Sequence, residues 1–295
     1  MADLSYPPPP EALVVPVYDN HTHLDHKPHS PAAEAPGEEL SPQDQLDRAS
    51  SVGVRGVVQV GTDLETSRWS ADIAAHEPRV LAAVALHPNT APELERAGSL
   101  DEHLAGIAEL ATRPRVRAIG ETGLDFFRTG DEGRDAQICS FEAHIAIAKE
   151  NDLALQIHDR DAHAEVVQTL RRVGAPERTV FHCFSGDAEF AKEVAAEGWF
   201  VSFAGTVTFK NAASLRDALD VVPRANILIE TDAPYLTPTP WRGRPNSSYL
   251  LPHTLRFMAE CLDTDASMLA AQIASNTELV YGRWDDNAVY APRDV

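Results

Sequence analysis

The feature that most constrains the fold is a regular alternation of short apolar runs with longer stretches rich in Ala, Leu, Glu and Arg. Short apolar, β-branched runs predict strands buried on both faces, and strands separated by helices pair in parallel as βαβ units. The expected strands cover residues 13–18, 54–60, 80–85, 116–119, 153–157, 179–181, 199–203 and 227–229. The expected helices lie near 42–52, 66–77, 99–112, 135–151, 161–173, 187–197, 211–221, 249–262 and 265–275.

The number of these units and the length of the chain together indicate a closed barrel. Eight strand–helix units within 295 residues fit a (β/α)8 TIM barrel, an α/β fold, better than an open sheet. We expect one barrel domain at 13–284, after an extended Pro-rich lead-in at 1–12 and before a tail at 285–295. The Pro-rich, acidic stretch 26–42 reads as a loop after the first strand.

Composition excludes several classes of protein. No apolar run approaches the roughly 20 residues that span a bilayer, and the first residues lack the charged and apolar regions of a signal peptide. Three widely spaced cysteines predict neither a disulfide framework nor a structural zinc site. We therefore expect a cytoplasmic protein with no membrane association and no obligate protein partner.

The chain is strongly acidic. Its formal net charge of −20 argues against a broad basic surface for nonspecific nucleic-acid binding. A nuclease that holds only a few nucleotides needs no more than local cations, so nucleic acid remains open as a substrate.

A pair of histidines follows the first expected strand. In an extended chain, residues i and i+2 point to the same side, so His21 and His23 can grip one metal ion. Taken alone, the pair is equally consistent with two surface histidines in a loop.

Further residues able to bind metal follow later strands. Glu121 follows the fourth expected strand, and His158 and His182 directly follow the fifth and sixth. Asp232 comes after the last strand. Each alone is readily explained as a packed or surface residue, but the carboxyl ends of all barrel strands meet at one mouth, where active sites form. Six ligands of this kind suit two divalent ions with an acidic bridge, so the set predicts a metal centre.

Eight motifs in order along the chain resemble the TatD family of metal-dependent deoxyribonucleases, within the amidohydrolase-like superfamily of barrels. They are DNHTHLD (19–25), ALHPN (85–89), GETGLDFF (120–127), QIHDRD (156–161), FHCFSG (181–186), ETDAPYL (230–236), WRGRPN (241–246) and SNTELVYG (275–282). Three features depart from the family pattern: a longer loop at 26–44, Asn89 where many relatives carry histidine, and Ser247, Ser248 and Tyr249 in place of an acidic-Pro stretch.

The resemblance implies a ligand set for two divalent ions, with Mg, Mn and Zn as candidates. One ion would be held by His21, His23, Glu121 and Asp232, and the other by Glu121, His158 and His182, so that Glu121 bridges. The implied activity is that of a deoxyribonuclease of the 3′–5′ exonuclease type, with DNA, in particular single-stranded ends, as the substrate.

The chemistry of the residues suggests roles around this centre. Asp232, beside the metal, is the candidate general base, and Glu121 is the second catalytic carboxylate. Arg242 and Arg244 are expected to contact substrate phosphates, because guanidinium groups match phosphate oxygens, and they are equally consistent with solvated surface residues. His87 is expected either to contact a phosphate or to support a metal ligand. Asp125 is either a hydrogen-bond acceptor behind a ligand or a helix cap.

Three aromatic residues, Phe126, Phe127 and Trp241, either stack on bases or pack in the core.

The residues are also consistent with two functions other than that of a nuclease. The same ligands serve a metal-dependent ester or amide hydrolase, such as an aminoacyl-tRNA deacylase, and a non-catalytic barrel would use the metal structurally.

Overall fold

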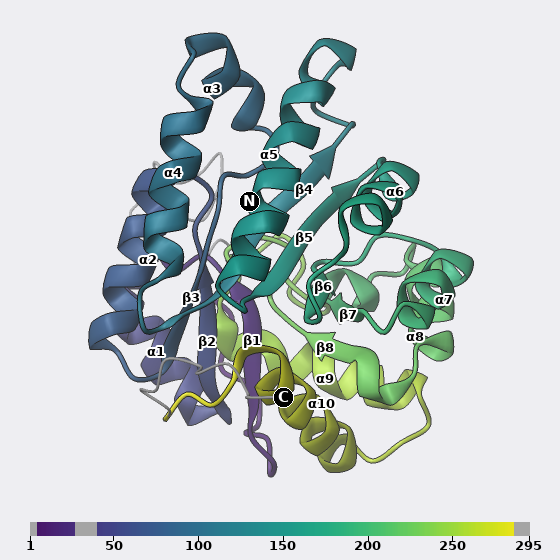
Figure 1. Cartoon of the computed structure of the whole chain (residues 1–295). Helices are drawn as coiled ribbons and strands as arrows, with labels where there is room; N and C mark the ends of the chain where they lie inside the picture. The colour runs from purple at the N-terminus through teal and green to yellow at the C-terminus, as the bar shows by residue number, and fades with distance from the viewer. Residues whose placement is uncertain (1–4, 27–39, 286–295) are drawn as a thin grey trace, which may run out of the picture. The chain divides into compact units, whose positions relative to one another are not determined.

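The computed structural model describes residues 5–26 and 40–285. Within them the strands alternate with helices, as the sequence predicts (Figure 1). The strands are β1 (Val17–Thr22), β2 (Val54–Val60), β3 (Val80–Val84), β4 (Val116–Asp125), β5 (Ala154–Arg160), β6 (Thr179–Phe181), β7 (Phe200–Phe203) and β8 (Ile227–Ile229). The α-helices are α1 (Pro42–Ser51), α2 (Leu64–His76), α3 (Ala91–Ala97), α4 (Leu100–Ala111), α5 (Asp131–Glu150), α6 (His163–Val173), α7 (Ala188–Ala196), α8 (Ala213–Val221), α9 (Leu251–Cys261) and α10 (Ala266–Tyr281). Short 3-10 helices are η1 (Gly205–Thr208), η2 (Arg224–Asn226) and η3 (Ser248–Leu250).

The chain divides into two compact units. The first comprises Met1–Val58 and Gly186–Leu279, and it carries β1, β7, β8 and most of β2. In it β7 pairs with β8 in parallel, with Val201 opposite Ile227 and Phe203 opposite Ile229. The segment after β8 then joins the end of β1, because Thr22 forms a parallel bridge with Ala233.

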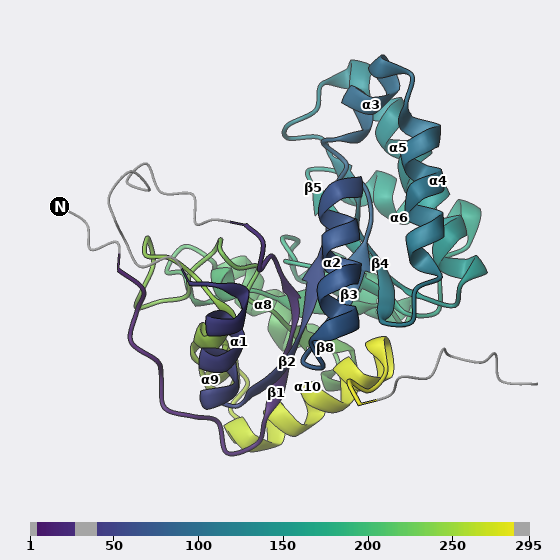
Figure 2. The same cartoon turned by 90° about the vertical axis from the view of Figure 1, so that its left-hand side faces the viewer.

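The second unit comprises Gln59–Ser185 and Val280–Val295, and it carries β3, β4, β5 and β6. All three neighbouring pairs in this series are parallel. Helices α2, α4 and α5 pack on these strands, and α3 packs against α5 (Figure 2). The strand interiors are aliphatic and fully buried, which places the apolar core of the unit between strands and helices.

Local sequence signals explain where several helices begin. Ser41 caps α1 and Asp63 caps α2, each through a reciprocal capping box with the third residue of the helix. Asp187 caps α7 by accepting a hydrogen bond from the backbone N–H of Phe190. These side chains satisfy backbone donors that a helix start leaves without an intrahelical partner.

Several predicted bounds are confirmed and others are wrong. The strands expected at 54–60, 179–181 and 227–229 match β2, β6 and β8. The first strand was expected at 13–18 but β1 runs Val17–Thr22, and β4 extends six residues beyond its expected end at 119, since it reaches Asp125. Helix α3 was not predicted.

Most of the expected loop at 26–42 lies outside the described residues, and the helix after it begins at Pro42. The expected domain bounds at 12 and 284 stay predictions. Within residues 5–26 and 40–285, no helix is long and apolar enough to cross a membrane. The cytoplasmic location also stays a prediction.

Candidate metal centre

In the first unit, two histidines and an aspartate form what we call the His21 cluster: His21, His23 and Asp232. The Nε2 atoms of the two histidines lie 3.4 Å apart. They lie 3.8 Å (His21) and 3.6 Å (His23) from Oδ1 of Asp232. Both imidazoles are buried. Two imidazole nitrogens and a carboxylate oxygen that converge in this way are a donor set suited to a divalent ion.

The backbone fixes the His21 cluster. The N–H of Asp232 donates to the carbonyl of His21 (3.0 Å), and the N–H of His23 donates to the carbonyl of Ala233 (2.8 Å). Asp232 itself has a positive φ of 52°, a conformation that turns the chain sharply after β8. The three candidate ligands are therefore positioned by hydrogen bonds between β1 and the segment after β8.

Asp19 supports this arrangement, although its sequence position had not marked it as a candidate. Its Oδ1 accepts a hydrogen bond from the N–H of Thr231 (2.9 Å), and its Oδ2 accepts one from the Thr231 hydroxyl (2.5 Å). Complete burial raises the pKa of Asp19 to about 7, although these hydrogen bonds act in the opposite direction. The signal available in the sequence was its position two residues before His21.

In the second unit, a carboxylate and three histidines form what we call the Glu121 cluster: Glu121, His158, His182 and His87. Oε2 of Glu121 lies 2.8 Å from Nε2 of His182, 3.3 Å from Nδ1 of His158 and 3.9 Å from Nε2 of His87. Burial alone would raise the pKa of Glu121, but the imidazoles outweigh burial and hold it well below its ordinary value. Glu121 is therefore an ionised, buried carboxylate at the centre of nitrogen donors.

Asp125 contacts Nε2 of His158, the ring nitrogen that is not directed at Glu121. Its Oδ2 lies 3.3 Å from Nε2 of His158, and it also accepts a hydrogen bond from the Asn89 amide (3.0 Å). Oδ1 accepts the backbone N–H of Arg128 (2.9 Å), so Asp125 both caps a turn and supports the histidine. Burial lowers the pKa of His158, but Asp125 and Glu121 outweigh burial and raise it. A carboxylate on the far nitrogen is the usual support of a metal-binding histidine.

His87 is held in one protonation state. Its Nδ1 accepts a hydrogen bond from the backbone N–H of Asn89 (3.0 Å), and burial lowers the pKa of His87 to about 4. The neutral ring therefore carries its proton on Nε2, the atom that faces Glu121. Asn89, a departure from the family pattern, here links His87 to Asp125.

The structure corrects where the candidate ligands lie relative to the strands. His23, His182 and Asp232 follow a strand as expected, whereas His21, Glu121 and His158 lie inside β1, β4 and β5. The polar residues stay in the strands because backbone pairing continues past them. On β4 and β5 the register runs from Thr122 opposite Ile157 to Asp125 opposite Arg160.

Two of the expected phosphate contacts, Arg242 and Arg244, lie in the first unit. The guanidinium of Arg244 donates to the carbonyl oxygens of Ser5 and Tyr6 and so anchors the N-terminal segment. The guanidinium of Arg242 lies over the ring of Phe209, 4.2 Å from its centroid. A substrate role for either arginine stays a prediction.

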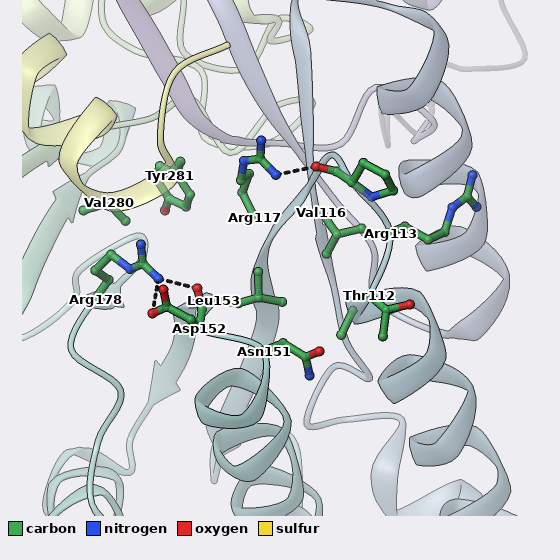
Figure 3. A pocket seen from close by; sticks show the side chains of 12 residues that line it. Thr112, Arg113, Val116, Arg117, Asn151, Asp152, Leu153, Arg178, Val280 and Tyr281 are labelled. Carbon is green, nitrogen blue, oxygen red and sulfur yellow. Dashed lines mark hydrogen bonds and ion pairs between the residues drawn. The ribbon is translucent and has the colours of Figure 1, made fainter. Parts of the chain in front are cut away.

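The second unit also contains a cavity at the amino-terminal ends of its strands (Figure 3). There Arg178 donates to the carbonyl and carboxylate oxygens of Asp152, and Arg117 donates to the carbonyl of Pro114. These arginines satisfy carbonyls just beyond the ends of α5 and α4. Glu121, His158 and His182 lie toward the carboxyl ends of their strands, and barrel active sites form at that end, so we assign the cavity a structural role.

The chain resembles known proteins both in fold and in sequence. The chain is similar to a solved structure described as YjjV, a TatD homologue from Escherichia coli K12, with a TM-score of 0.79 and 28% identity over 90% of this chain and 98% of that one. This confirms the predicted fold, a single-domain α/β barrel of eight parallel strands of the TIM-barrel type. The sequence matches the TatD related DNase family over residues 18–282. The chain belongs to this family of metal-dependent hydrolases.

Two relatives of similar length have informative descriptions. An uncharacterized metal-dependent hydrolase TatD of Mycobacterium tuberculosis is 40% identical over 90% of this chain and 97% of its own length. A 3′-5′ ssDNA/RNA exonuclease TatD of Escherichia fergusonii is 34% identical over 81% of this chain and 92% of its own length.

Proposed function

We propose that the chain is a 3′–5′ exonuclease that hydrolyses phosphodiester bonds at the ends of single-stranded DNA and depends on divalent ions. The observation that carries the hydrolytic part is the ionised Glu121 among three histidines. A single-stranded nucleic acid as the substrate is supported by the relative from Escherichia fergusonii, which is described as a 3′-5′ ssDNA/RNA exonuclease. A role of the metal in folding alone would not require Asp232 to remain accessible, yet its side chain is 14% exposed.

The two clusters supply ligands for two ions, one in each unit. His21, His23 and Asp232 suit one ion. Glu121, with His158 and His182 at 3.3 Å and 2.8 Å from its Oε2, suits the other. That Glu121 bridges both ions stays a prediction. Histidine nitrogens favour Zn or Mn, while carboxylates and a phosphate substrate also suit Mg.

Bound divalent ions lower the pKa of a water molecule and neutralise charge on phosphoryl oxygens. The residues supply the remaining steps. Asp232, whose side chain is 14% exposed beside His21 and His23, would accept a proton from the attacking water. His87 presents an N–H from Nε2 and remains neutral at physiological pH, so it can donate a hydrogen bond to a phosphate oxygen.

A substrate comparison tests this proposal. Metal-free protein is reconstituted with Mg, Mn or Zn and offered a 5′-labelled DNA strand, an RNA strand of the same sequence and an aminoacyl ester. We expect stepwise shortening of the labelled DNA from its 3′ end with at least one metal. If the protein hydrolyses only the ester, the protein is an ester hydrolase and the proposed nuclease activity is wrong. Tight metal binding with no hydrolysis of any substrate would indicate a structural metal.

A further inference from the structure

Phe127, two residues after the end of β4 in the second unit, is an aromatic side chain exposed to solvent. It is 61% exposed, unlike the aromatic residues of the core. The guanidinium carbon of Arg160 lies 3.8 Å from the centroid of its ring. We call the two side chains the Phe127–Arg160 pair. Together the accessible ring and the cation offer a stacking surface beside a positive charge, which suits a ligand that is planar and anionic.

The strand register places this pair next to the Glu121 cluster. Gly123 lies opposite His158, and Asp125 lies opposite Arg160. Since side chains alternate along a strand, Arg160 is on the same side of β5 as His158 and about 7 Å further along. The N–H of Phe126 donates to the carbonyl of Arg160 (2.9 Å), which fixes the start of the Phe127 segment against β5.

The charge of Arg160 is available to a ligand. In the part of the chain that the structure describes, its guanidinium forms no hydrogen bond or ion pair, and its contact is with the Phe127 ring. Arg134 provides a comparison, because it also covers a phenylalanine, Phe126, but forms an ion pair with Asp131 at 3.1 Å. In a chain of net charge −20, a cation without a carboxylate partner beside a metal-binding cluster is suited to phosphate.

We propose that the Phe127–Arg160 pair is a nucleotide subsite, in which a base stacks on the Phe127 ring while Arg160 contacts the adjoining phosphate. This inference rests on the proposed function, since it assumes a single-stranded substrate. Stacking on an aromatic ring accepts every base, so the subsite would select unpaired strands without selecting sequence. Loss of one stacked base is expected to weaken binding roughly tenfold.

The test compares two 5′-labelled DNA strands that differ at one position near the 3′ end, one with thymine and the other abasic there. The position is moved along the strand in separate pairs of oligonucleotides. For wild-type protein, we expect one position at which the abasic strand has a KM roughly tenfold higher, with little change in kcat. Phe127→Leu should raise the KM for the thymine strand to that of the abasic strand, and Phe127→Trp should restore the difference.

Two further variants sharpen the test. Arg160→Gln should weaken binding of both strands and reduce the salt dependence of binding by about one phosphate contact. Met268→Leu changes another exposed apolar side chain, on α10, and should behave as wild type. Phe127→Leu protein that still distinguishes the two strands as wild type does would overturn the subsite.

Equilibrium binding separates the subsite from the proposed function. Fluorescence anisotropy measures the affinity for the same two strands whether or not they are cleaved. If the protein binds the thymine strand more tightly through Phe127 but cleaves neither strand, the proposed subsite stands and the proposed nuclease activity is wrong. If the protein cleaves DNA but binds the two strands equally at every position, the proposed nuclease activity stands and the proposed subsite is wrong.

Discussion

The Nε2 atom of His182 lies 2.8 Å from Oε2 of Glu121, which brings the residue after β6 against a carboxylate in the middle of β4. Both side chains are buried, and no amide or hydroxyl could replace the negative charge that the imidazoles face. The Glu121 cluster thus has one carboxylate at its centre. Removing that carboxylate should therefore weaken the interactions of all three imidazoles.

Glu121→Gln should therefore remove metal from the Glu121 cluster and lower nuclease activity by at least about 100-fold, because a neutral amide replaces a ligand. Metal content per chain and initial rates on labelled DNA measure both effects. Glu142→Gln is the matched control, since Glu142 forms an ion pair with Arg172 on exposed surface of the same unit. Unchanged metal content in Glu121→Gln would refute the ligand role.

Asp125→Asn should weaken metal binding about 10- to 100-fold, because the amide is a poorer acceptor for Nε2–H of His158 than the carboxylate. Competition with a metal chelator measures the affinity. Asp131→Asn, a change at an exposed site on α5, should leave the affinity unchanged. If Asp125→Asn binds metal as tightly as wild type does, Asp125 acts only as a cap for the turn.

His87→Ala should separate substrate contact from metal binding. Nδ1 of His87 is occupied by the Asn89 N–H, so the ring offers a donor and not a ligand atom toward Glu121. We expect activity to fall roughly tenfold or more, by loss of one hydrogen bond to the phosphate, while metal content stays the same. A parallel loss of metal would instead make His87 a ligand.

His144 on α5 predicts a pH dependence of stability. Its Nε2 accepts the backbone N–H of Leu86 (3.1 Å), and burial lowers its pKa to about 4. The unfolded chain binds the proton near pH 6.5, so stability is fully present above that pH and falls as pH decreases toward 4. When the pH is lowered from 7 to 5, protonation of His144 in the unfolded chain should decrease the free energy of unfolding by about 2 kcal/mol.

Urea unfolding at the two pH values measures this loss. His144→Gln retains an acceptor for Leu86 and cannot bind the proton, so its free energy of unfolding should fall less than that of wild type over the same range. Equal slopes in the two proteins would contradict the assignment of a neutral, buried His144.

The sequence was sufficient to predict the barrel, because alternating apolar runs are local signals. The residues that it offered as metal ligands do lie together in the two clusters, and their binding of metal stays a prediction. The bounds of β1, β4 and β5 were not predictable, since polar residues such as Glu121 stay in a strand only when a neighbouring strand pairs with them. Asp19 was missed for a similar reason: its partner Thr231 is 212 positions away in the sequence.

Phe127 and Asn89 were visible in the sequence, but their surroundings were not. The sequence could not decide between stacking and packing for Phe127, and its exposure answers that question in favour of an accessible ring. Asn89 departs from the family pattern, so its role could not be predicted. In the structure its side-chain amide donates a hydrogen bond to Asp125, which in turn contacts His158.

The central claim is that the Glu121 and His21 clusters bind metal for hydrolysis of DNA. Its most direct test follows a 5′-labelled single strand with metal-free and metal-loaded wild type, beside metal-loaded Glu121→Gln and Glu142→Gln. We predict stepwise shortening by metal-loaded wild type and by Glu142→Gln, with metal-free protein and Glu121→Gln inactive. An intact strand with metal-loaded wild type, or the same shortening with Glu121→Gln, would contradict the claim.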